Sequence, residues 1–253
     1  MRRPLSYSQV STWLRCPKLY ELRYVQKAEP EKVGMALLLG SAVHDSLSAE
    51  GARRIEGGEG GYDYAKRSFR EMLLVKVEHP EAPVDMGEKS LIEHMEVGEG
   101  LILTYFEHGQ VEPLLAVEKE FELELGDGLK LVGVIDFVVQ GGNGPEVVEL
   151  KTAARSWSDL QAKLSMQGAI YAMALGGDEP APVTYRVLVK NKAPKAQEFR
   201  LAPESEEGRR TLETVREVAG GIRAGCFPRN CSVQTCSGCA YLKQCQGRGT
   251  LAA

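Results

Sequence analysis

No hydrophobic run in this 253-residue sequence is long enough to cross a membrane. The apolar run at residues 35–39 (Met-Ala-Leu-Leu-Leu) is far shorter than the roughly 20 residues that a spanning helix needs. Arg2 and Arg3 are not followed by the apolar segment of a secretory signal, so the sequence predicts no signal peptide. Internal repeats are absent as well. These absences predict a cytoplasmic protein without a membrane partner.

An excess of positive charge is also missing, since the formal net charge at pH 7 is −4. That balance argues against a general nucleic-acid binder. The charge is unevenly distributed: residues 1–150 carry 16 Lys or Arg against 26 Asp or Glu, whereas residues 151–253 carry 15 against 9. A basic half can supply a phosphate-binding face, with an ordinary solvated charge run as the alternative. The candidates for a basic channel are Arg186, Lys190, Lys192 and Lys195.

Hydrophobic periodicity predicts helices in the first part of the chain and strands after them. The helical segments are residues 5–25, interrupted by Pro17, and then 37–54, 64–77 and 91–108. Predicted strands are residues 114–125, 129–140 and 146–150, and a helix at 156–175 separates them from strands at 183–190 and 197–201. A helix at 204–224 precedes a cysteine-rich tail. Three consecutive strands followed by a helical crossover predict an α/β fold with a mixed sheet and helices packed against it.

Three charged residues lie inside the most apolar of these strands: Asp136, Glu149 and Lys151. Single charges in strands usually face solvent. Here a turn at residues 141–144 would place the strand of Asp136 beside the strand of Glu149 and Lys151. Two carboxylates and an ammonium at one point of a sheet suit a divalent metal held by oxygens, with the lysine beside a phosphate. The spacing therefore predicts a metal site, and a solvent-exposed strand face is the alternative.

Other polar residues are ambiguous on their own. His44 lies near the start of the helix predicted at 37–54, and a lone histidine is more often a packed or surface residue than a ligand. Gln167 and Tyr171 are four residues apart and therefore share one face of a helix. In isolation, this pair indicates a polar helix edge.

The six cysteines are informative because the expected compartment argues against disulfides. Cys236, Cys239 and Cys245 have the spacing of metal ligands, in a short tail that has little else to fold around. A closed site needs a fourth ligand, and the candidates are Cys231, Cys226 and the distant Cys16. Zinc is the commoner occupant of such spacings, an iron–sulfur cluster is the alternative, and the spacing does not decide between them.

Taken together, the motifs resemble those of the PD-(D/E)XK nucleases of the RecB type, which include CRISPR adaptation exonucleases and AddB-like nucleases. The motifs occur in family order and span nearly the whole chain, so they are specific as a set although each is weak alone. They are residues 5–17 with Tyr20 and Tyr24, residues 40–44, residues 133–136, residues 148–152, Gln167 with Tyr171, and residues 225–228.

The resemblance implies a restriction-endonuclease-like mixed sheet flanked by helices, and a catalytic metal site. The implied ligands of Mg²⁺ or Mn²⁺ are His44, Asp136, Glu149 and the carbonyl of Leu150. Three further residues complete the implied catalytic set. They are Lys151, which would orient the attacking water or stabilise charge on the phosphate, Gln167, which would position the site, and Tyr171, which would contact DNA.

The resemblance also implies a 4Fe-4S cluster, with zinc as the less favoured occupant, that clasps the N-terminal helix to the tail. Its implied ligands are Cys16, Cys236, Cys239 and Cys245, with Cys226 and Cys231 as nearby competitors. The implied architecture is a single nuclease domain over residues 1–253. Residues 1–30 and 226–248 would form the clasp, 31–112 a helical insertion that carries His44, and 113–225 the catalytic sheet core.

The implied function is that of a metal-dependent DNA nuclease, an exonuclease on single-stranded DNA or DNA ends, in recombination, repair, phage replication or CRISPR adaptation. DNA would be its main partner, and a helicase or integration-complex protein a second one. One alternative is a non-catalytic DNA-binding or adaptor module of such a complex, and another is a zinc-stapled hydrolase of a different phosphoester. The intact set His44, Asp136, Glu149 and Lys151 counts against the adaptor.

Overall fold

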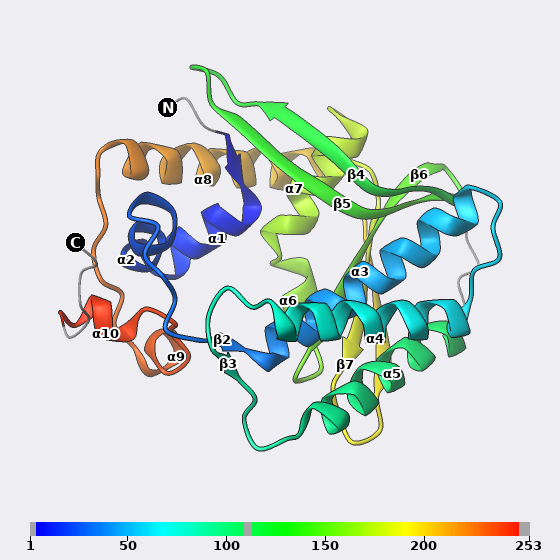
Figure 1. Ribbon diagram of the computed structural model, residues 1–253. Helices are drawn as coiled ribbons and strands as arrows, with labels where there is room; N and C mark the ends of the chain where they lie inside the picture. Colours follow the sequence, from blue (N-terminus) through cyan, green and yellow to red (C-terminus); the bar gives the residue numbers. More distant parts are fainter. Residues whose placement is uncertain (1–3, 109–112, 248–253) are drawn as a thin grey trace.

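The computed structural model describes residues 4–108 and 113–247 and shows an α/β fold in which helices flank a mixed sheet (Figure 1). The sheet has six strands in the order β1-β5-β6-β7-β8, and β4 pairs with the other edge of β5. A separate parallel pair, β2 (Val33–Gly34) and β3 (Val84–Asp85), joins two loops. The α/β class and the mixed sheet predicted from the sequence are confirmed.

The strands of the main sheet run in both directions. Both β4 and β6 are antiparallel to β5, β7 is parallel to β6, β8 is antiparallel to β7, and β1 is parallel to β5. Their bounds are β1 (Leu5–Ser6), β4 (Leu114–Glu124), β5 (Lys130–Gly141), β6 (Gly144–Ala153), β7 (Val183–Val189) and β8 (Lys195–Leu201). The parallel β6–β7 pair is connected by helices, as such a crossover requires.

The helices fall into three groups along the chain. The first contains α1 (Tyr7–Arg15), α2 (Pro17–Tyr20) and a π-helical turn (Glu21–Val25). The second contains α3 (Met35–Ile55), α4 (Tyr62–Glu78) and α5 (Leu91–Glu107). The third contains α6 (Asp159–Lys163), α7 (Met166–Gly176), α8 (Ser205–Arg223), α9 (Val233–Cys236) and α10 (Leu242–Cys245). Within the described ranges, no helix has both the length and the apolar character that a membrane span requires.

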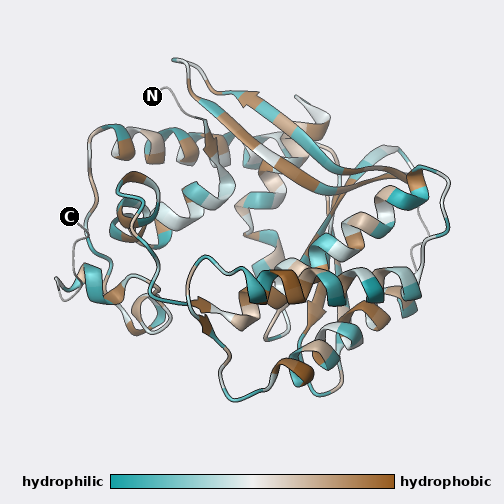
Figure 2. Cartoon of the chain, viewed as in Figure 1, coloured by the Kyte–Doolittle hydropathy of each residue, from teal (hydrophilic) through white to brown (hydrophobic). Residues whose placement is uncertain are grey.

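Two hydrophobic cores form, one on each face of the sheet. On one face, Leu131 and Ile135 of β5 pack with Ile170 of α7 and with residues of α8. On the other face, Phe137 of β5 packs with Leu39 and other residues of α3, α4 and α5. Residues 137–139 of β5 and 147–150 of β6 contribute to both cores, which is why these segments are nearly continuous apolar runs (Figure 2).

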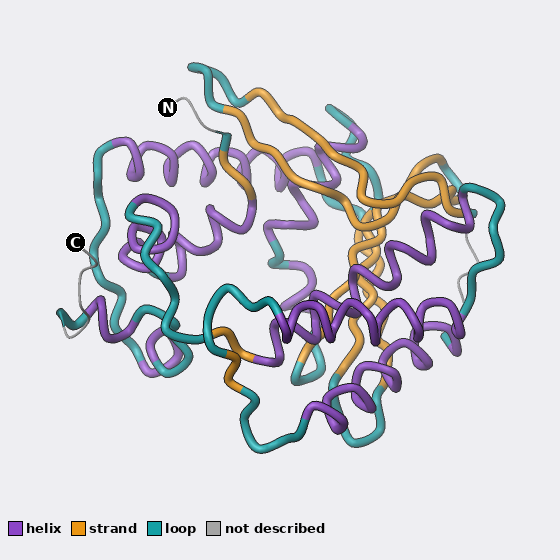
Figure 3. The backbone as a smooth tube through the Cα atoms, viewed as in Figure 1, coloured by secondary structure: helices purple, strands orange, loops and turns teal. Residues whose placement is uncertain are grey.

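The strands β5 and β6 separate next to Asp136. The β5–β6 hairpin pairs from Gly141 with Gly144 up to Phe137 with Val148, and β1 pairs with the same edge of β5 at Leu131 and Val132. Among the described ladders, that edge has no strand partner over residues 133–136. Beyond this fork, β4 and β5 continue as a long ribbon that the two-residue strand β1 joins at Leu131 and Val132 (Figure 3). The fork leaves room for side chains between two rigid strands.

Several elements differ from the sequence-based prediction for physical reasons. The predicted helix at 5–25 is split, because Cys16 before Pro17 is extended, as the residue before a proline prefers. The predicted helix at 156–175 is two helices, since Ser158 caps α6 and the extended Ser165 interrupts the chain before α7. The two-residue strands β1, β2 and β3 were not predicted, because two residues carry no periodicity.

Candidate active site

Asp136 lies on β5 at the fork, with its carboxylate directed toward β6 and α3. Its Oδ2 accepts a hydrogen bond from the backbone N–H of Leu150 at 2.9 Å. His44, in the middle of α3, brings Nδ1 to 3.5 Å from the same oxygen. The structure therefore joins a helix of the second group to the centre of the sheet. His44 and Asp136 are 92 positions apart in the sequence, and only the fold brings them into contact.

Glu149 lies on β6, across the fork from Asp136, and is almost completely buried. Its Oε1 accepts hydrogen bonds from Nζ of Lys151 at 2.5 Å and from Nε2 of Gln167 at 2.8 Å. Its Oε2 is buried and has no hydrogen-bond partner among the described residues. An unsatisfied carboxylate oxygen in a protein interior is costly unless a cation or a proton compensates it.

Lys151, Gln167 and Tyr171 extend this network from the sheet onto α7. Lys151 Nζ also donates to Oε1 of Gln167 at 2.7 Å, so the amide of Gln167 bridges the lysine and Glu149. The same Nε2 of Gln167 donates to the hydroxyl of Tyr171 at 3.0 Å, as their four-residue spacing on one helix allows. The network fixes the side chain of Lys151 beside the two carboxylates.

The surroundings shift the pKa values of Asp136 and Glu149 in opposite directions. Burial alone would raise the pKa of Asp136, but the His44 ring, Lys151 and the Leu150 amide together outweigh it and hold that pKa below its usual range. Burial raises the pKa of Glu149 to about 8, the charge of Asp136 adds to the rise, and Lys151 opposes it only in part. The Asp136 carboxylate is therefore ionised at neutral pH, whereas the Glu149 carboxyl exchanges a proton near neutral pH.

The donors present fit a small divalent cation. No group of three or more His, Cys, Asp or Glu side chains in residues 4–108 and 113–247 is already arranged around a single ion. However, the free Oε2 of Glu149 lies at the same fork as the Asp136 carboxylate and the His44 ring. Carboxylate oxygens suit Mg²⁺ and Mn²⁺, and an imidazole nitrogen favours the transition metal.

The sequence reasoning assigned no role to two residues near this network. Tyr7, the first residue of α1, lies close enough to Lys151 and Glu149 for their charges to affect its pKa, which burial raises. Ser165, the N-cap of α7, accepts a hydrogen bond from the hydroxyl of Tyr185 at 2.8 Å and also neighbours Tyr7. Tyr7 belongs to the opening motif of the sequence. Its position in that motif does not indicate that it lies near Glu149 and Lys151, which are more than 140 residues further along the chain.

The four residues predicted as candidates for a basic channel lie in different surroundings. Arg186 is paired with Glu198, lies next to Tyr105 and is largely covered, so its place in an open channel was predicted wrongly. The alternation of side chains along β7 directs Arg186 toward α5. The pattern of charges in the sequence does not indicate this direction. The amine of Lys190 donates to the carbonyl of Ala36 at 3.2 Å, whereas Lys192 and Lys195 are exposed at the β7–β8 turn.

Five cysteines converge on a pocket between the N-terminal helices and the C-terminal tail. The pocket that they line also contains apolar side chains of α2, the following turn and α10, and Cys226 is exposed outside it. Burial raises the pKa of the Cys239 thiol, and the neighbouring thiols raise it further. The cysteines in this pocket are Cys16, Cys231, Cys236, Cys239 and Cys245.

Hydrogen bonds also hold the two ends of the described chain together. Asn230 Nδ2 donates to the carbonyl of Arg15 at 2.9 Å. The N–H of Glu31 donates to the carbonyl of Ala240 at 2.7 Å, and the N–H of Lys243 donates to the carboxylate of Glu31 at 2.6 Å. Figure 1 shows α1 and α2 beside α9 and α10. The joining of the N-terminal helices to the tail is thus a feature of the fold, whatever occupies the cysteine pocket.

Comparisons with known proteins bear on the fold and on the family. A solved structure from Eubacterium rectale, named "Putative exonuclease", covers 100% of this chain and 90% of its own, with 15% identity and a TM-score of 0.60. At this identity, the likeness concerns the fold alone. The structure of SSO0001 is 18% identical and covers 95% of this chain and 98% of its own, but its TM-score of 0.39 carries no argument. Curated proteins gave no match.

A family model covers nearly all of the described chain. It matches residues 4–246, which include the fork, its network and the cysteine-rich tail. The chain belongs to the PD-(D/E)XK nuclease superfamily.

Proposed function

We propose that this nuclease is a metal-dependent deoxyribonuclease that acts as an exonuclease on single-stranded DNA or DNA ends. One observation carries the proposal: Asp136 and Glu149 meet at the fork of β5 and β6, and the buried Oε2 of Glu149 lacks a partner. Two neighbouring carboxylates, one of them almost completely buried, need compensating positive charge beyond that of Lys151. A divalent cation would supply it.

Mg²⁺ or Mn²⁺ would be held by His44, Asp136, Glu149 and the carbonyl of Leu150. When bound, such an ion lowers the pKa of a water ligand and offsets charge on the phosphodiester. Lys151 would stabilise negative charge on the phosphate, since Gln167 and Glu149 hold its ammonium beside the acids. Gln167 would position the side chains of Lys151 and Glu149. Its Nε2 also donates a hydrogen bond to the hydroxyl of Tyr171.

DNA is the proposed substrate because positive charge follows the catalytic edge of the sheet. The strands β6 and β7 are parallel, and the N–H of Lys190 donates to the carbonyl of Ala153 at the end of β6. Lys190, Lys192 and Lys195 therefore follow the same edge of the sheet as Lys151. The carboxyl ends of parallel strands are a common place for ligands in α/β folds. A local basic path on an acidic protein suits a threaded single strand.

The cysteine pocket is proposed to hold a 4Fe-4S cluster on Cys16, Cys236, Cys239 and Cys245. Two things support this proposal: the resemblance of the motifs, and a pocket that brings all four of these cysteines together from the two ends of the chain.

The remaining expectations stay predictions. They include a cytoplasmic location, a helicase or integration-complex partner, and service in recombination, repair, phage replication or CRISPR adaptation. The division into a clasp, a helical insertion and a sheet core is likewise proposed. Residue 112, at the end of the insertion, and residue 248, at the end of the clasp, lie outside the described residues.

The proposal is tested with DNA of matched sequence in linear single-stranded, linear duplex and circular single-stranded form, labelled at either end. An exonuclease with Mn²⁺ should degrade the linear single strand from one end and leave the circle intact. Cleavage of the circle would contradict the exonuclease assignment, and cleavage of RNA alone would contradict the assignment to DNA. Binding without cleavage in Mg²⁺ and Mn²⁺ would favour the non-catalytic adaptor instead.

A further inference from the structure

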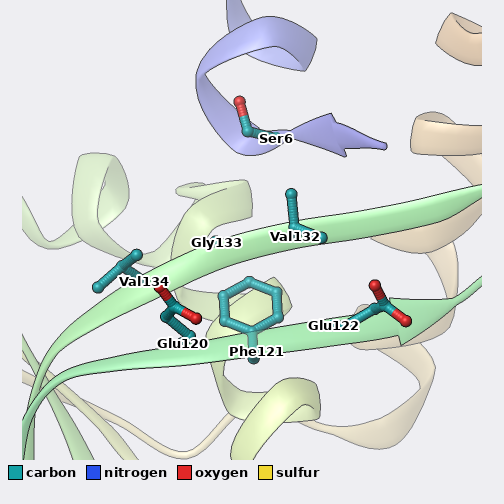
Figure 4. Close-up of a pocket in the computed structure, with 7 residues that line it drawn as sticks. All are labelled: Ser6, Glu120, Phe121, Glu122, Val132, Gly133 and Val134. Atoms are coloured by element: carbon teal, nitrogen blue, oxygen red, sulfur yellow. The ribbon is translucent and has the colours of Figure 1, made fainter. Parts of the chain in front are cut away.

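Tyr7 is brought to the fork by the pairing of β1 with β5. The strand β1 pairs in parallel at Leu5 with Leu131 and at Ser6 with Val132, on the edge of β5 that also carries the β5–β6 hairpin. Figure 4 shows Ser6 where β1 passes into α1, beside Val132. Tyr7 follows directly as the first residue of α1, where the stretch of β5 without a strand partner among the described ladders begins. The chain therefore leads Tyr7 into the gap that contains the candidate active site.

The other side of this gap is formed by the continuation of β6. Its last pair with β5 joins Val148 to Phe137, and β6 then carries Glu149 and Lys151 into the gap. Both charges act on the hydroxyl of Tyr7, so the three side chains are neighbours. Burial raises the pKa of Tyr7, and the hydroxyl therefore stays protonated at neutral pH and can donate a hydrogen bond.

A chain of hydroxyl groups orients the hydroxyl of Tyr7. The fully buried Tyr185 donates a hydrogen bond to Oγ of Ser165 at 2.8 Å. A Cβ atom on Gly168 would lie 2.7 Å from the Tyr185 hydroxyl, so this glycine leaves room for the contact. Ser165 in turn interacts with the Tyr7 hydroxyl and lowers the pKa of Tyr7, as a hydrogen-bond donor does. Because Ser165 is the donor in this contact, the proton of Tyr7 is left for another acceptor.

Two neighbouring hydrogen-bond donors therefore remain unused at the fork. The ammonium of Lys151 has three donors, and its contacts with Glu149 and Gln167 use two of them. Within residues 4–108 and 113–247, no hydrogen bond uses the third donor of Lys151 or the proton of Tyr7. Both side chains are partly exposed, so a ligand can reach them. A cationic and a neutral donor side by side suit an anion that carries two oxygens on one atom, as a phosphodiester does.

We propose that Tyr7 is a further catalytic residue, whose hydroxyl donates a hydrogen bond to a non-bridging oxygen of the cleaved phosphodiester beside Lys151. This inference rests on the proposed nuclease function and extends it to the opening motif of the sequence. The reaction places negative charge on these oxygens, and a donor that is held in position beforehand stabilises that charge. Ser165 and Tyr185 are positioning residues that act through Tyr7.

The first test uses Tyr7→Phe in the full-length protein, with cleavage of a single strand measured in Mn²⁺. Phenylalanine keeps the packed ring and removes the donor, so cleavage should slow by roughly ten- to hundredfold while the melting temperature stays near that of wild type. Tyr64→Phe is the matched control, because the half-buried ring of Tyr64 packs against Arg53 on the helices α3 and α4, and it should cut at the wild-type rate. Cleavage by Tyr7→Phe at the wild-type rate would overturn the proposal.

A substrate with sulfur in place of one non-bridging oxygen separates the contact from any effect on folding. Sulfur accepts hydrogen bonds poorly, and the two stereoisomers place it on different sides of the phosphorus. Wild-type protein should cut the isomer with sulfur toward Tyr7 roughly three- to tenfold more slowly for want of this hydrogen bond. That penalty should disappear in Tyr7→Phe. Penalties that are the same in both proteins for both isomers would overturn the contact, even if Tyr7→Phe were slow.

Double variants test the positioning residues. Ser165→Ala and Tyr185→Phe should each slow cleavage when Tyr7 is present, and neither should slow it further in Tyr7→Phe, because both act through the same hydroxyl. Ser205→Ala removes a hydroxyl that donates to the carbonyl of Asp178 on the surface, and it should leave the rate unchanged. Effects of Ser165→Ala and Tyr185→Phe that persist in full in Tyr7→Phe would show a merely structural role and overturn the hydroxyl chain.

Binding keeps this inference distinct from the proposed function. Fluorescence anisotropy of labelled oligo-dT in Ca²⁺ should show binding by Tyr7→Phe that is weaker by about threefold or more, with Tyr64→Phe unchanged. If wild type bound the strand but cut no DNA, this difference would support the Tyr7 contact while the nuclease assignment failed. If wild type cut DNA and Tyr7→Phe matched it in binding, rate and sulfur penalty, the nuclease assignment would stand and the role of Tyr7 would be overturned.

Discussion

The backbone N–H of Leu150 donates a hydrogen bond to Oδ2 of Asp136 at 2.9 Å, so the peptide unit that links Glu149 to Leu150 holds the acid of the neighbouring strand. This bond crosses the fork where the ladder of β5 and β6 ends. The hydrogen bond fixes the Asp136 carboxylate through a backbone N–H rather than through a flexible side chain. The relative placement of the two acids is therefore a property of the sheet, and their substitution should alter chemistry more than folding.

The first prediction concerns Glu149→Gln. The amide keeps the shape of the side chain but removes the charge that a divalent cation requires, so cleavage should fall by about a thousandfold or more. The metal-free variant should also be more stable than wild type above about pH 8, because burial of the Glu149 anion is then avoided. Single-strand cleavage and thermal melts in EDTA measure the two effects. Glu146→Gln, on the same strand, is the control and should change neither.

The second prediction concerns Lys151→Met. Methionine preserves much of the aliphatic stem but removes the ammonium that contacts Glu149 and Gln167. Cleavage should be lost, on the order of a hundredfold or more, while binding of DNA is retained. The pKa of Glu149 should rise further, since Lys151 is the residue that lowers it. A Lys151→Met variant that cuts at the wild-type rate would contradict the role given to the lysine.

The third prediction concerns pH. The pKa of Glu149 is raised, so the folded protein binds more protons than the unfolded chain between the ordinary value of 4.5 and about 8. The stability that this group contributes is full below the lower value and is lost as the pH rises through the higher one. Asp136 has the opposite sign: its contribution is present above its ordinary pKa and is lost as the pH falls through its lowered pKa.

A cation at this fork must displace the proton from Glu149. Stabilisation of the protein by Mn²⁺ should therefore increase with pH up to about 8, with protons released on binding. Thermal melts with Mn²⁺ and with EDTA across this range measure the difference. A stabilisation by Mn²⁺ that is equal at about pH 6 and about pH 8.5 would show that Glu149 does not hold the metal.

The fold was largely predictable because its main elements are long and strongly patterned. The apolar strands around Asp136 and Glu149 and the turn between them gave β5, β6 and their hairpin directly. Short elements were not predictable: β1 consists of Leu5 and Ser6 alone, and its partner in β5 lies more than 120 residues away. Only tertiary pairing, which has no local pattern, creates that strand.

The sequence predicted that the residues of the candidate site would meet, but it did not predict most of their contacts. The hairpin brought Asp136 beside Glu149, and the helical spacing brought Gln167 beside Tyr171. The free oxygen of Glu149 and the proximity of Tyr7 follow from the packing of α1 and α7, which the sequence does not display. The pairing of Arg186 with Glu198 likewise depends on the β7–β8 register.

The fourth prediction concerns the cysteine pocket. Anaerobically purified protein should be brown and contain about four irons per chain. Cys16 and Cys236 are about 220 residues apart, so their joint ligation closes most of the chain, worth on the order of 5 kcal/mol by analogy with a disulfide. Cys16→Ser should therefore bleach the protein and lower its melting temperature before cleavage is affected. The same applies to Cys236, Cys239 and Cys245.

Two further cysteines serve as controls for this clasp. Cys226→Ser should have little effect, because Cys226 is exposed outside the pocket. Cys231→Ser should also retain colour, and its position within the pocket makes it the more demanding control. A colourless protein with one zinc would refute the cluster. Unchanged iron in Cys16→Ser would refute ligation by Cys16 and point to Cys231 as the fourth ligand.

The most direct test of a metal-dependent active site at the fork is the rate of cleavage of an end-labelled single strand by one preparation of wild-type protein. The rate is measured after chelation with EDTA and again after addition of excess Mn²⁺. The fork of Asp136 and Glu149 predicts no cleavage in EDTA and full recovery with Mn²⁺. Cleavage that persists after thorough removal of divalent ions would contradict it.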